Sequence, residues 1–251
     1  MAVYKSKGIV LRSIRYGEAD RILDLYTRDA GLVSAIAKGI RRTRSRFGAR
    51  LEPLSCVEFM AYHGRTLDTV TQAEVLRNFR GVREDLERFE AAAGMVGSVK
   101  ALSGGDEADR RVFNLLYNGL DALERSESGF ASIEAGFGLK LSMLAGYAPQ
   151  FDDCLSCGIY LDEAPEPLYF APSLGGVLCQ ECRAATGDAF PMPPGALGRL
   201  RELMKYPIRE INSGNGPGEA VLRVVRAHVL AHAPGNAIPG GARITGSRRP
   251  A

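Results

Sequence analysis

The sequence predicts a multidomain α+β protein in which a five-stranded barrel precedes an α-helical domain with an inserted four-cysteine module. Three observations lead to this fold class. Short runs of β-branched and aliphatic residues fill the first 80 positions, apolar residues recur at helical spacing from residue 86 onward, and two C-x2-C pairs interrupt the helical part. With 251 residues and 45% hydrophobic content, the chain can bury a core in each part.

Five strands are expected in the N-terminal part. They are the runs Lys7–Ile14, Arg21–Thr27, Leu32–Lys38, Leu54–Tyr62 and Leu67–Val75. Short connections that contain Gly31 and Gly64 join the second strand to the third and the fourth to the fifth, as in hairpins with a bulge. Such closely spaced strands favour a small closed barrel of the oligonucleotide-binding type (OB-fold), with an SH3-like barrel as the alternative.

Three amphipathic helices are expected next. Their apolar faces are Leu86, Phe89, Ala93 and Val96, then Phe113, Leu116, Leu120 and Leu123, then Phe130, Ile133, Phe137, Leu141 and Leu144. Two further helices are expected at Pro194–Lys205 and Gly218–His232. The expected domains are a barrel over residues 1–80, a helical domain over 81–233 with the cysteine module at 150–190, and a flexible basic tail over 234–251.

Four of the five cysteines form two identical motifs, Cys154–Cys157 and Cys179–Cys182. A two-residue spacer lets one turn direct both sulfurs at the same point, and four thiolates complete the tetrahedral shell of Zn²⁺. Because no coordination position is left for water or substrate, we expect one structural zinc ion per chain. Buried free thiols and a dithiol redox pair are the alternatives, and Cys56 stands apart from the motifs.

No enzymatic activity is expected. The sequence has no phosphate-binding loop, dinucleotide-binding turn or nucleophile elbow, and its three histidines are scattered. His228 and His232 share a helix face, but the cysteines already satisfy one zinc ion, so both histidines are expected to be packing or surface residues. The carboxylates at 84–87 and 152–153 would suit Mg²⁺ in a nuclease, but they are expected to be solvated surface.

The net charge of +3 is unevenly distributed. Residues 1–80 carry 15 Lys and Arg against 8 Asp and Glu (+7), residues 81–190 carry 8 against 18 (−10), and residues 191–251 carry 9 against 3 (+6). Residues 41–50 hold five arginines and no carboxylate. Guanidinium groups bridge phosphates and stack on bases, so this segment is expected to bind nucleic acid and not merely to be a solvated loop.

Aromatic residues near this segment could serve either as base-stacking platforms or as core residues. They are Tyr16, Tyr26, Phe47, Phe59 and Tyr62. Their position on the barrel decides between the two roles.

Six short motifs form a series along the first 80 residues. They are Lys7–Arg12, Tyr16–Arg21, Gly31–Ala35, Ala37–Gly39, Arg46–Gly48 and Leu67–Thr69. Together they closely resemble the RecO family of bacterial DNA repair proteins. Beyond residue 80 the resemblance lies in the architecture, a helical region interrupted by paired cysteines.

The resemblance implies an OB-fold barrel joined to a helical domain with a zinc module. It implies binding to single- and double-stranded DNA and annealing of complementary strands without nucleotide hydrolysis. It further implies that the protein acts with RecR, often with RecF, to load RecA onto gapped DNA covered by single-strand-binding protein, whose tail it can contact. The candidate DNA-binding residues are basic residues of the barrel, namely Arg15, Arg21, Lys38, Arg41, Arg42, Arg44, Arg46 and Arg50.

Two rival functions stay open at this point. One is a protein-interaction adaptor without annealing activity, and the other is a zinc-containing transcription or translation factor that binds specific sequences. Because the sequence contains neither a membrane span nor the apolar core of a signal peptide, we expect a cytoplasmic, nucleoid-associated protein without membrane contact.

Overall fold

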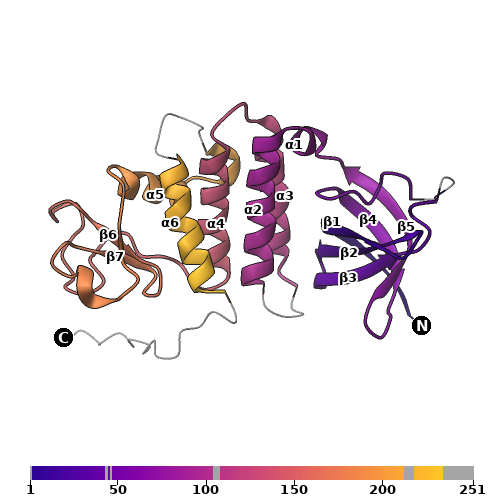
Figure 1. Ribbon diagram of the computed structural model, residues 1–251, viewed down its shortest axis with the longest axis horizontal. Helices are drawn as coiled ribbons and strands as arrows, with labels where there is room; N and C mark the ends of the chain where they lie inside the picture. The colour runs from indigo at the N-terminus through magenta and orange to yellow at the C-terminus, as the bar shows by residue number, and fades with distance from the viewer. Residues whose placement is uncertain (1, 43–44, 46, 104–107, 212–217, 234–251) are drawn as a thin grey trace.

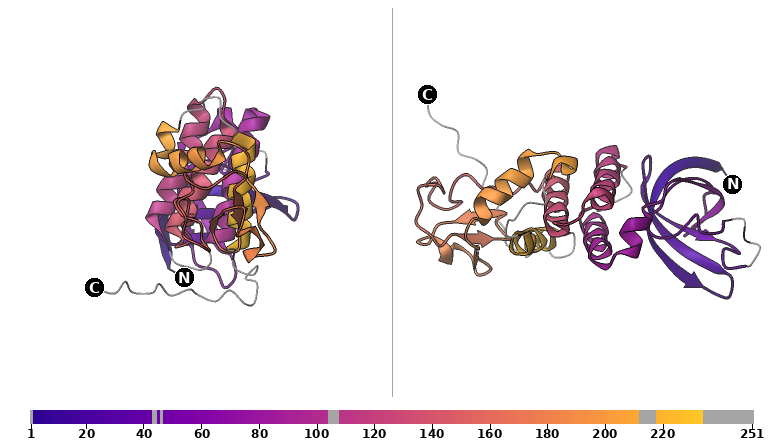
Figure 2. Two further views of the ribbon diagram at one scale, coloured as in Figure 1. Left: turned by 90° about the vertical axis from the view of Figure 1, so that its left-hand side faces the viewer. Right: turned by 90° about the horizontal axis from the view of Figure 1, so that it is seen from above.

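The structure is a computed structural model, and it describes residues 2–42, 45, 47–103, 108–211 and 218–233. The barrel, the helices and the cysteine module lie in a row along the long axis of the molecule (Figures 1 and 2). The predicted tail, residues 234–251, lies outside the described residues. In the part of the chain that the structure describes, no helix is long and apolar enough to cross a membrane.

The N-terminal strands close into the predicted five-stranded barrel. They are β1 (Val3–Tyr16), β2 (Asp20–Thr27), β3 (Gly31–Ala37), β4 (Cys56–Tyr62) and β5 (Asp68–Arg77), in the order β1-β2-β3-β5-β4. β1 pairs with both β2 and β4. A register shift between Val10 and Arg12 bends β1, which lets it hydrogen-bond with both strands as the barrel closes. β3 and β5 run parallel, which closes the barrel and removes its free edges.

The barrel interior is filled partly by the long connection between β3 and β4. Phe47 and Leu51 of this connection are 1% and 0% exposed and belong to the barrel core. Tyr26 and Phe59 are also buried, so a base-stacking role for these two and for Phe47 is wrong. A closed barrel must fill its interior with side chains, and Phe47 and Phe59 meet that need, whereas Tyr26 packs among the helical side chains.

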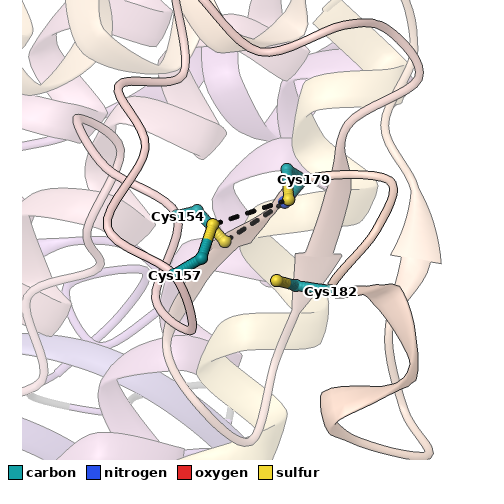
Figure 3. A group of neighbouring side chains, drawn as sticks. All are labelled: Cys154, Cys157, Cys179 and Cys182. Carbon is teal, nitrogen blue, oxygen red and sulfur yellow. Dashed lines mark hydrogen bonds between the residues drawn. The ribbon is translucent and has the colours of Figure 1, made fainter.

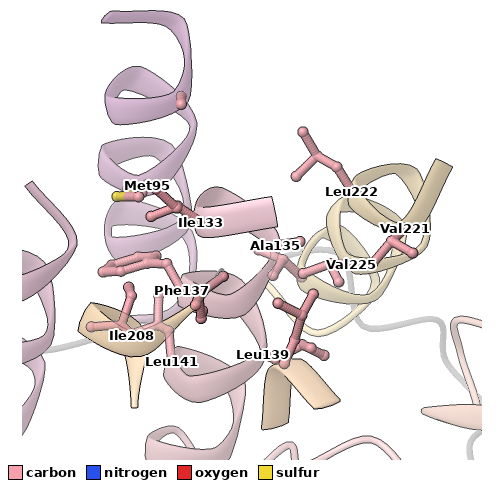
Figure 4. Close-up of a cluster of buried hydrophobic side chains, with 14 of the residues drawn as sticks. Met95, Ile133, Ala135, Phe137, Leu139, Leu141, Ile208, Val221, Leu222 and Val225 are labelled. Carbon is pink, nitrogen blue, oxygen red and sulfur yellow. The ribbon is translucent and has the colours of Figure 1, made fainter. Parts of the chain in front are cut away.

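Six helices follow among the described residues. They are α1 (Arg80–Glu84), α2 (Leu86–Leu102), α3 (Arg110–Arg125), α4 (Phe130–Leu144), α5 (Ala196–Lys205) and α6 (Gly218–Ala231). α4 lies at the centre and packs against α2, α3, α5 and α6. Its side chains are buried on nearly every face, among them Ile133, Phe137 and Leu139 (Figure 4).

The predicted apolar face of α2 is wrong. Leu86 and Phe89 are 72% and 40% exposed and Ala93 is exposed, so only Val96 of the four predicted residues is buried. The face that does pack consists mainly of small or flexible residues, Ala91, Ala92, Met95, Val99 and Leu102. The large apolar side chains of Leu86 and Phe89 therefore do not mark the contact surface of this helix.

The reason is a close approach between α2 and α4 at Gly94. A Cβ atom at Gly94 would lie 2.1 Å from Oε1 of Glu134, a side chain of α4 that is 4% exposed. The Glu134 carboxylate accepts two hydrogen bonds from Arg226 of α6, at 2.8 and 2.9 Å. Gly94 thus leaves room for the buried carboxylate of an ion pair that joins α4 to α6 beside α2.

The barrel and the helices share one apolar core. Ile9, Leu11 and Cys56 on the outer surface of the barrel belong to the same cluster of buried residues as the helical side chains. Burial raises the pKa of the Cys56 thiol to about 11, so this cysteine is a neutral packing residue. The Lys100–Asp24 ion pair at 2.7 Å adds a polar contact across the same boundary.

Replacing Gly94 with Ala is expected to destabilise the protein, although alanine is ordinarily the better helix former. The added methyl group would displace the Glu134 carboxylate from Arg226, and an unsatisfied buried polar group costs about 1–3 kcal/mol. Gly97→Ala on the same helix is the matched control, because nothing lies within 4 Å of its Cβ position. The free energy of unfolding of that variant should rise by up to about 1 kcal/mol. Urea unfolding gives the free energy of unfolding of both variants relative to the wild type. If both variants change it by the same amount in the same direction, the close approach at Gly94 is contradicted.

Candidate metal centre and nucleic-acid interface

The cysteine motifs lie on two turns of a small module between α4 and α5. Its sheet has the order β7 (Gly176–Leu178), β6 (Tyr169–Ala171) and β8 (Phe190–Pro191), and a short 3-10 turn at Arg183–Ala185 lies between β7 and β8 in the chain. The amide of Leu155 donates a hydrogen bond of 3.0 Å to the carbonyl oxygen of Val177. This bond fixes the first cysteine turn beside the end of β7, where the second turn begins.

All four cysteine sulfurs of the two motifs come together (Figure 3). The Sγ atoms of Cys154, Cys157, Cys179 and Cys182 lie within 4.8 Å of one another, and those of Cys157 and Cys179 are 3.8 Å apart. A tetrahedral ion with metal–sulfur bonds of about 2.3 Å requires sulfur–sulfur distances of roughly 3.8 Å. The four residues therefore fit a tetrahedral metal ion and could hold one.

The surroundings of Cys154 favour a thiolate. Burial opposes ionisation of this sulfur, but backbone amides of Cys157, Cys179 and Ser156 donate hydrogen bonds to it and lower its pKa to about 6. The amide of Cys179 lies 3.4 Å from the sulfur. A thiolate is the form that binds metal ions, so Cys154 is suited to be a metal ligand.

His228 and His232 attach α6 to the module and do not form a metal site with other described residues. His228 is 1% exposed, and its Nε2 lies 2.7 Å from the carbonyl oxygen of Tyr147. Nδ1 of His232 lies 2.9 Å from the carbonyl oxygen of His228. Burial lowers the pKa of His228 to about 4, so the ring is neutral at pH 7. The prediction that His228 is a packing residue is confirmed.

The tip of the β1–β2 hairpin and the basic connection after β3 meet at one end of the barrel. Nη1 of Arg41 donates a hydrogen bond of 2.9 Å to the carbonyl oxygen of Glu18, and the backbone amide of Arg41 donates one of 2.9 Å to that of Ala19. The amide of Gly39 donates to Asp20 at 2.7 Å. Contacts within the barrel thus hold the start of the basic segment against the hairpin.

This contact gathers several of the predicted DNA-binding residues. Arg15, Lys38, Arg41 and Arg42 are all exposed around it, together with Tyr16, which is 54% exposed. We define these five residues as the basic end of the barrel. They present cationic groups and one aromatic ring to solvent at one end of the barrel, and this combination of groups binds single-stranded nucleic acid.

The remaining predicted residues have other surroundings. Arg21 lies opposite Arg15 in the β1–β2 register, but its side chain is only 25% exposed and pairs with Glu52 at 3.4 Å. Arg50 is exposed and donates a hydrogen bond of 3.3 Å to the carbonyl oxygen of Phe47. Arg44 and Arg46 lie outside the described residues.

A cavity of about 540 Å³ that the sequence pattern does not indicate lies on the helical domain. Its apolar lining residues, which we call its floor, include Leu115, Met143, Leu144, Met204 and Tyr206. Its cationic lining residues, which we call its rim, are Arg111, Lys140, Lys205 and Arg209, and no carboxylate is among the lining residues that the structure describes. Arg111 is also paired with Asp109 at 2.8 Å. These residues come from α3, α4, α5 and the turn after α5, so no motif within one segment of the sequence could indicate the cavity.

Comparisons with known proteins cover both halves of the chain. A family model described as Recombination protein O N terminal matches residues 1–79, and one described as Recombination protein O C terminal matches residues 83–237. The chain is 69% identical over 238 residues to the DNA repair protein RecO of Rubrobacter xylanophilus, covering 94% of this chain and 95% of that protein. It is 42% identical over 193 residues to RecO of a Nocardioides species, covering 76% and 78%.

Metal content tests the cysteine site. The wild-type protein is expected to contain a bound metal ion, and the double variant Cys154→Ser, Cys179→Ser is expected to lose it because only two thiolates remain. Cys56→Ala is the matched control, since Cys56 lies outside the cluster. Inductively coupled plasma mass spectrometry gives the metal-to-protein ratio. A double variant with the wild-type ratio would refute the site.

His228 should make stability depend on pH. Its folded pKa is about 4 against an ordinary value of 6.5. The unfolded chain therefore takes up a proton first, and the stability present above pH 6.5 is lost as the pH falls toward 4. Linkage gives a loss of about 2 kcal/mol between pH 7 and pH 5. The variant His228→Gln keeps a donor near Tyr147 but does not titrate. Urea unfolding at both pH values should show this additional loss of unfolding free energy only in the wild type. Equal losses in the wild type and the variant would contradict the proposed titration of His228.

Proposed function

Because this chain belongs to the RecO family of DNA repair proteins, we propose that it binds single- and double-stranded DNA and anneals complementary strands without nucleotide hydrolysis. We further propose that it acts with RecR, and often RecF, to help load RecA onto gapped DNA coated with single-strand-binding protein. The observation that carries DNA binding is the gathering of Arg15, Lys38, Arg41 and Arg42 at the basic end of the barrel.

Annealing would follow from charge neutralisation. Two strands repel each other through their phosphates, and a cationic surface that holds both lowers this repulsion and raises their local concentration. Base pairing then supplies the driving force. No part of this account needs a nucleotide or a reacting group on the protein.

The surroundings of the carboxylates support a protein without catalytic activity. Asp85 caps α2 by accepting a hydrogen bond of 2.9 Å from the amide of Arg88. Glu84 pairs with Arg80 at 2.6 Å, and Asp152 lies 3.6 Å from Arg201. These acidic groups already have structural partners, which argues against their use as ligands for a catalytic Mg²⁺.

We propose that the ion held by the cysteine cluster is zinc, one per chain. Four thiolates suit the tetrahedral preference of Zn²⁺ and leave no position for a substrate. When bound, the ion would supply a cross-link between the turn at Cys154–Cys157 and the turn at Cys179–Cys182. The role of these residues is then structural, and DNA is bound elsewhere.

The rim and floor of the cavity on the helical domain support a second contact, with the acidic tail of single-strand-binding protein. Cationic groups surround an apolar floor, which suits a peptide that carries both carboxylates and apolar side chains. Lys140 also donates a hydrogen bond of 2.5 Å to the carbonyl oxygen of Leu203 and so fixes one wall. This cavity is the specific observation that favours the alternative function, an adaptor without annealing activity.

The salt dependence of DNA binding tests the basic end of the barrel. Each phosphate contact on a single strand contributes about 0.7 to the slope of log K against log salt concentration. The variant Arg15→Ala, Arg42→Ala should therefore flatten the slope for an oligothymidine by about 1.4 and slow annealing of bare complementary strands. Its thermal melt should match the wild type, because both side chains are exposed. If slope and annealing rate both stay unchanged, the basic end is not the DNA site.

Charge reversal at the cavity rim separates the two functions. Arg111→Glu with Lys205→Glu should weaken binding of the tail peptide by about tenfold, as read from fluorescence anisotropy. Annealing of coated strands should slow while annealing of bare strands is retained. Arg223→Glu, on an exposed part of α6, is the control. Wild-type protein that binds the peptide but anneals no bare strands would be an adaptor.

A further inference from the structure

A buried carboxylate near the junction of the barrel and the helices is surrounded by three arginines. Asp121 of α3 is 3% exposed. Its Oδ1 lies 3.6 Å from Arg77, and its Oδ2 lies 3.1 Å from Arg125 and 3.7 Å from Arg209. The arginines come from the last residue of β5, the last residue of α3 and the short 3-10 turn Ile208–Glu210. Three segments that are distant in sequence thus place cations around one group.

The charges in this cluster do not balance. One carboxylate faces three guanidinium groups, and the nearby Glu124 is occupied as an acceptor for the amides of Gly81 and Val82 at the start of α1. Each guanidinium has five N–H donors, whereas a carboxylate has about four acceptor positions. Oδ2 of Asp121 makes no hydrogen bond despite its cationic neighbours. Asp121 can therefore accept hydrogen bonds from only a minority of the N–H donors of the three arginines.

The arginines reach solvent although their common anchor does not. The side chains of Arg77, Arg125 and Arg209 are 44%, 71% and 51% exposed. Arg77 also lies over the ring of Phe79, with 5.8 Å between its Cζ and the ring centroid. The buried anion and the ring limit the motion of these long side chains, which reduces the entropy lost when they bind a ligand.

We propose that Arg77, Arg125 and Arg209 form a second phosphate-binding site, in which Asp121 holds the three guanidinium groups ready for the backbone of bound DNA. The inference rests on the proposed DNA binding and extends it from the barrel into the helical domain. A phosphate accepts hydrogen bonds from several directions, and forked guanidinium groups match its oxygens. The nucleic-acid backbone is favoured over an acidic peptide because the cluster includes a barrel residue, and because Arg77 and Arg125 are not among the residues that line the cavity.

Binding of an oligothymidine at a series of salt concentrations tests the site. The variant Arg77→Gln, Arg125→Gln should flatten the slope of log K against log salt concentration by about 1.4, since two phosphate contacts are lost. Arg209 is left unchanged because it also lines the cavity. The matched control is Arg183→Gln, Arg223→Gln, which removes the same charge from exposed positions in the cysteine module and α6 and should leave the slope unchanged.

Two further variants keep the test decisive. If the double variant does not fold, Asp121→Asn is added, so that no buried charge is left unpaired, and the same flattening is expected. Arg77→Lys with Arg125→Lys should keep the slope, which depends on charge, but bind more weakly, because the forks are lost.

The outcomes separate this site from the proposed function. If wild-type protein binds no oligothymidine, the proposed function itself fails. If it binds, and only the variant at the basic end of the barrel changes the slope, the second site alone is overturned. The same result follows if the Arg77 and Arg125 variant loses affinity for the acidic tail peptide and keeps its DNA slope.

Discussion

The burial of α4 on nearly every face is the constraint on which the rest of the helical domain depends. A helix enclosed by four others must be apolar or must pair each buried polar group. Glu134 meets this condition through Arg226, and Gly136 and Gly138 leave room for Ile211 and Val225. The same helix supplies Lys140 to the cavity rim. Its enclosure therefore fixes α6, the turn after α5 and one wall of the cavity together.

In the barrel, the need to fill a narrow interior positions the basic residues. Ile40, Phe47 and Leu51 turn inward because they supply volume that the strands do not. Charged neighbours such as Arg42 and Arg50 then remain outside, where water solvates them. One segment thus anchors itself by its apolar residues and presents its arginines, and the hydrogen bonds of Arg41 hold it against the β1–β2 hairpin.

The cysteine module is joined to the helices by packing as well as by its proposed metal ion. Phe170, Val177 and Leu178 belong to the same buried cluster as the helical side chains, and His228 contacts the module from α6. Loss of the metal would remove a cross-link between two turns but not this apolar contact. Two contributions therefore stabilise the module: metal coordination within it and apolar burial against the helical domain.

The sequence by itself determined the five strands, the central helices and the cysteine set, because hydrophobic period and ligand spacing are local properties. It also identified the basic segment, although not that Phe47 is buried. Only the tertiary structure decided which face of α2 packs, because the close approach at Gly94 directs Met95 and Val99 inward and leaves Leu86 and Phe89 exposed. It alone brought Arg77, Arg125 and Arg209 around Asp121 and built the cavity from α3, α4 and α5. Contacts between segments far apart in the chain depend on packing geometry, and no local pattern records that geometry.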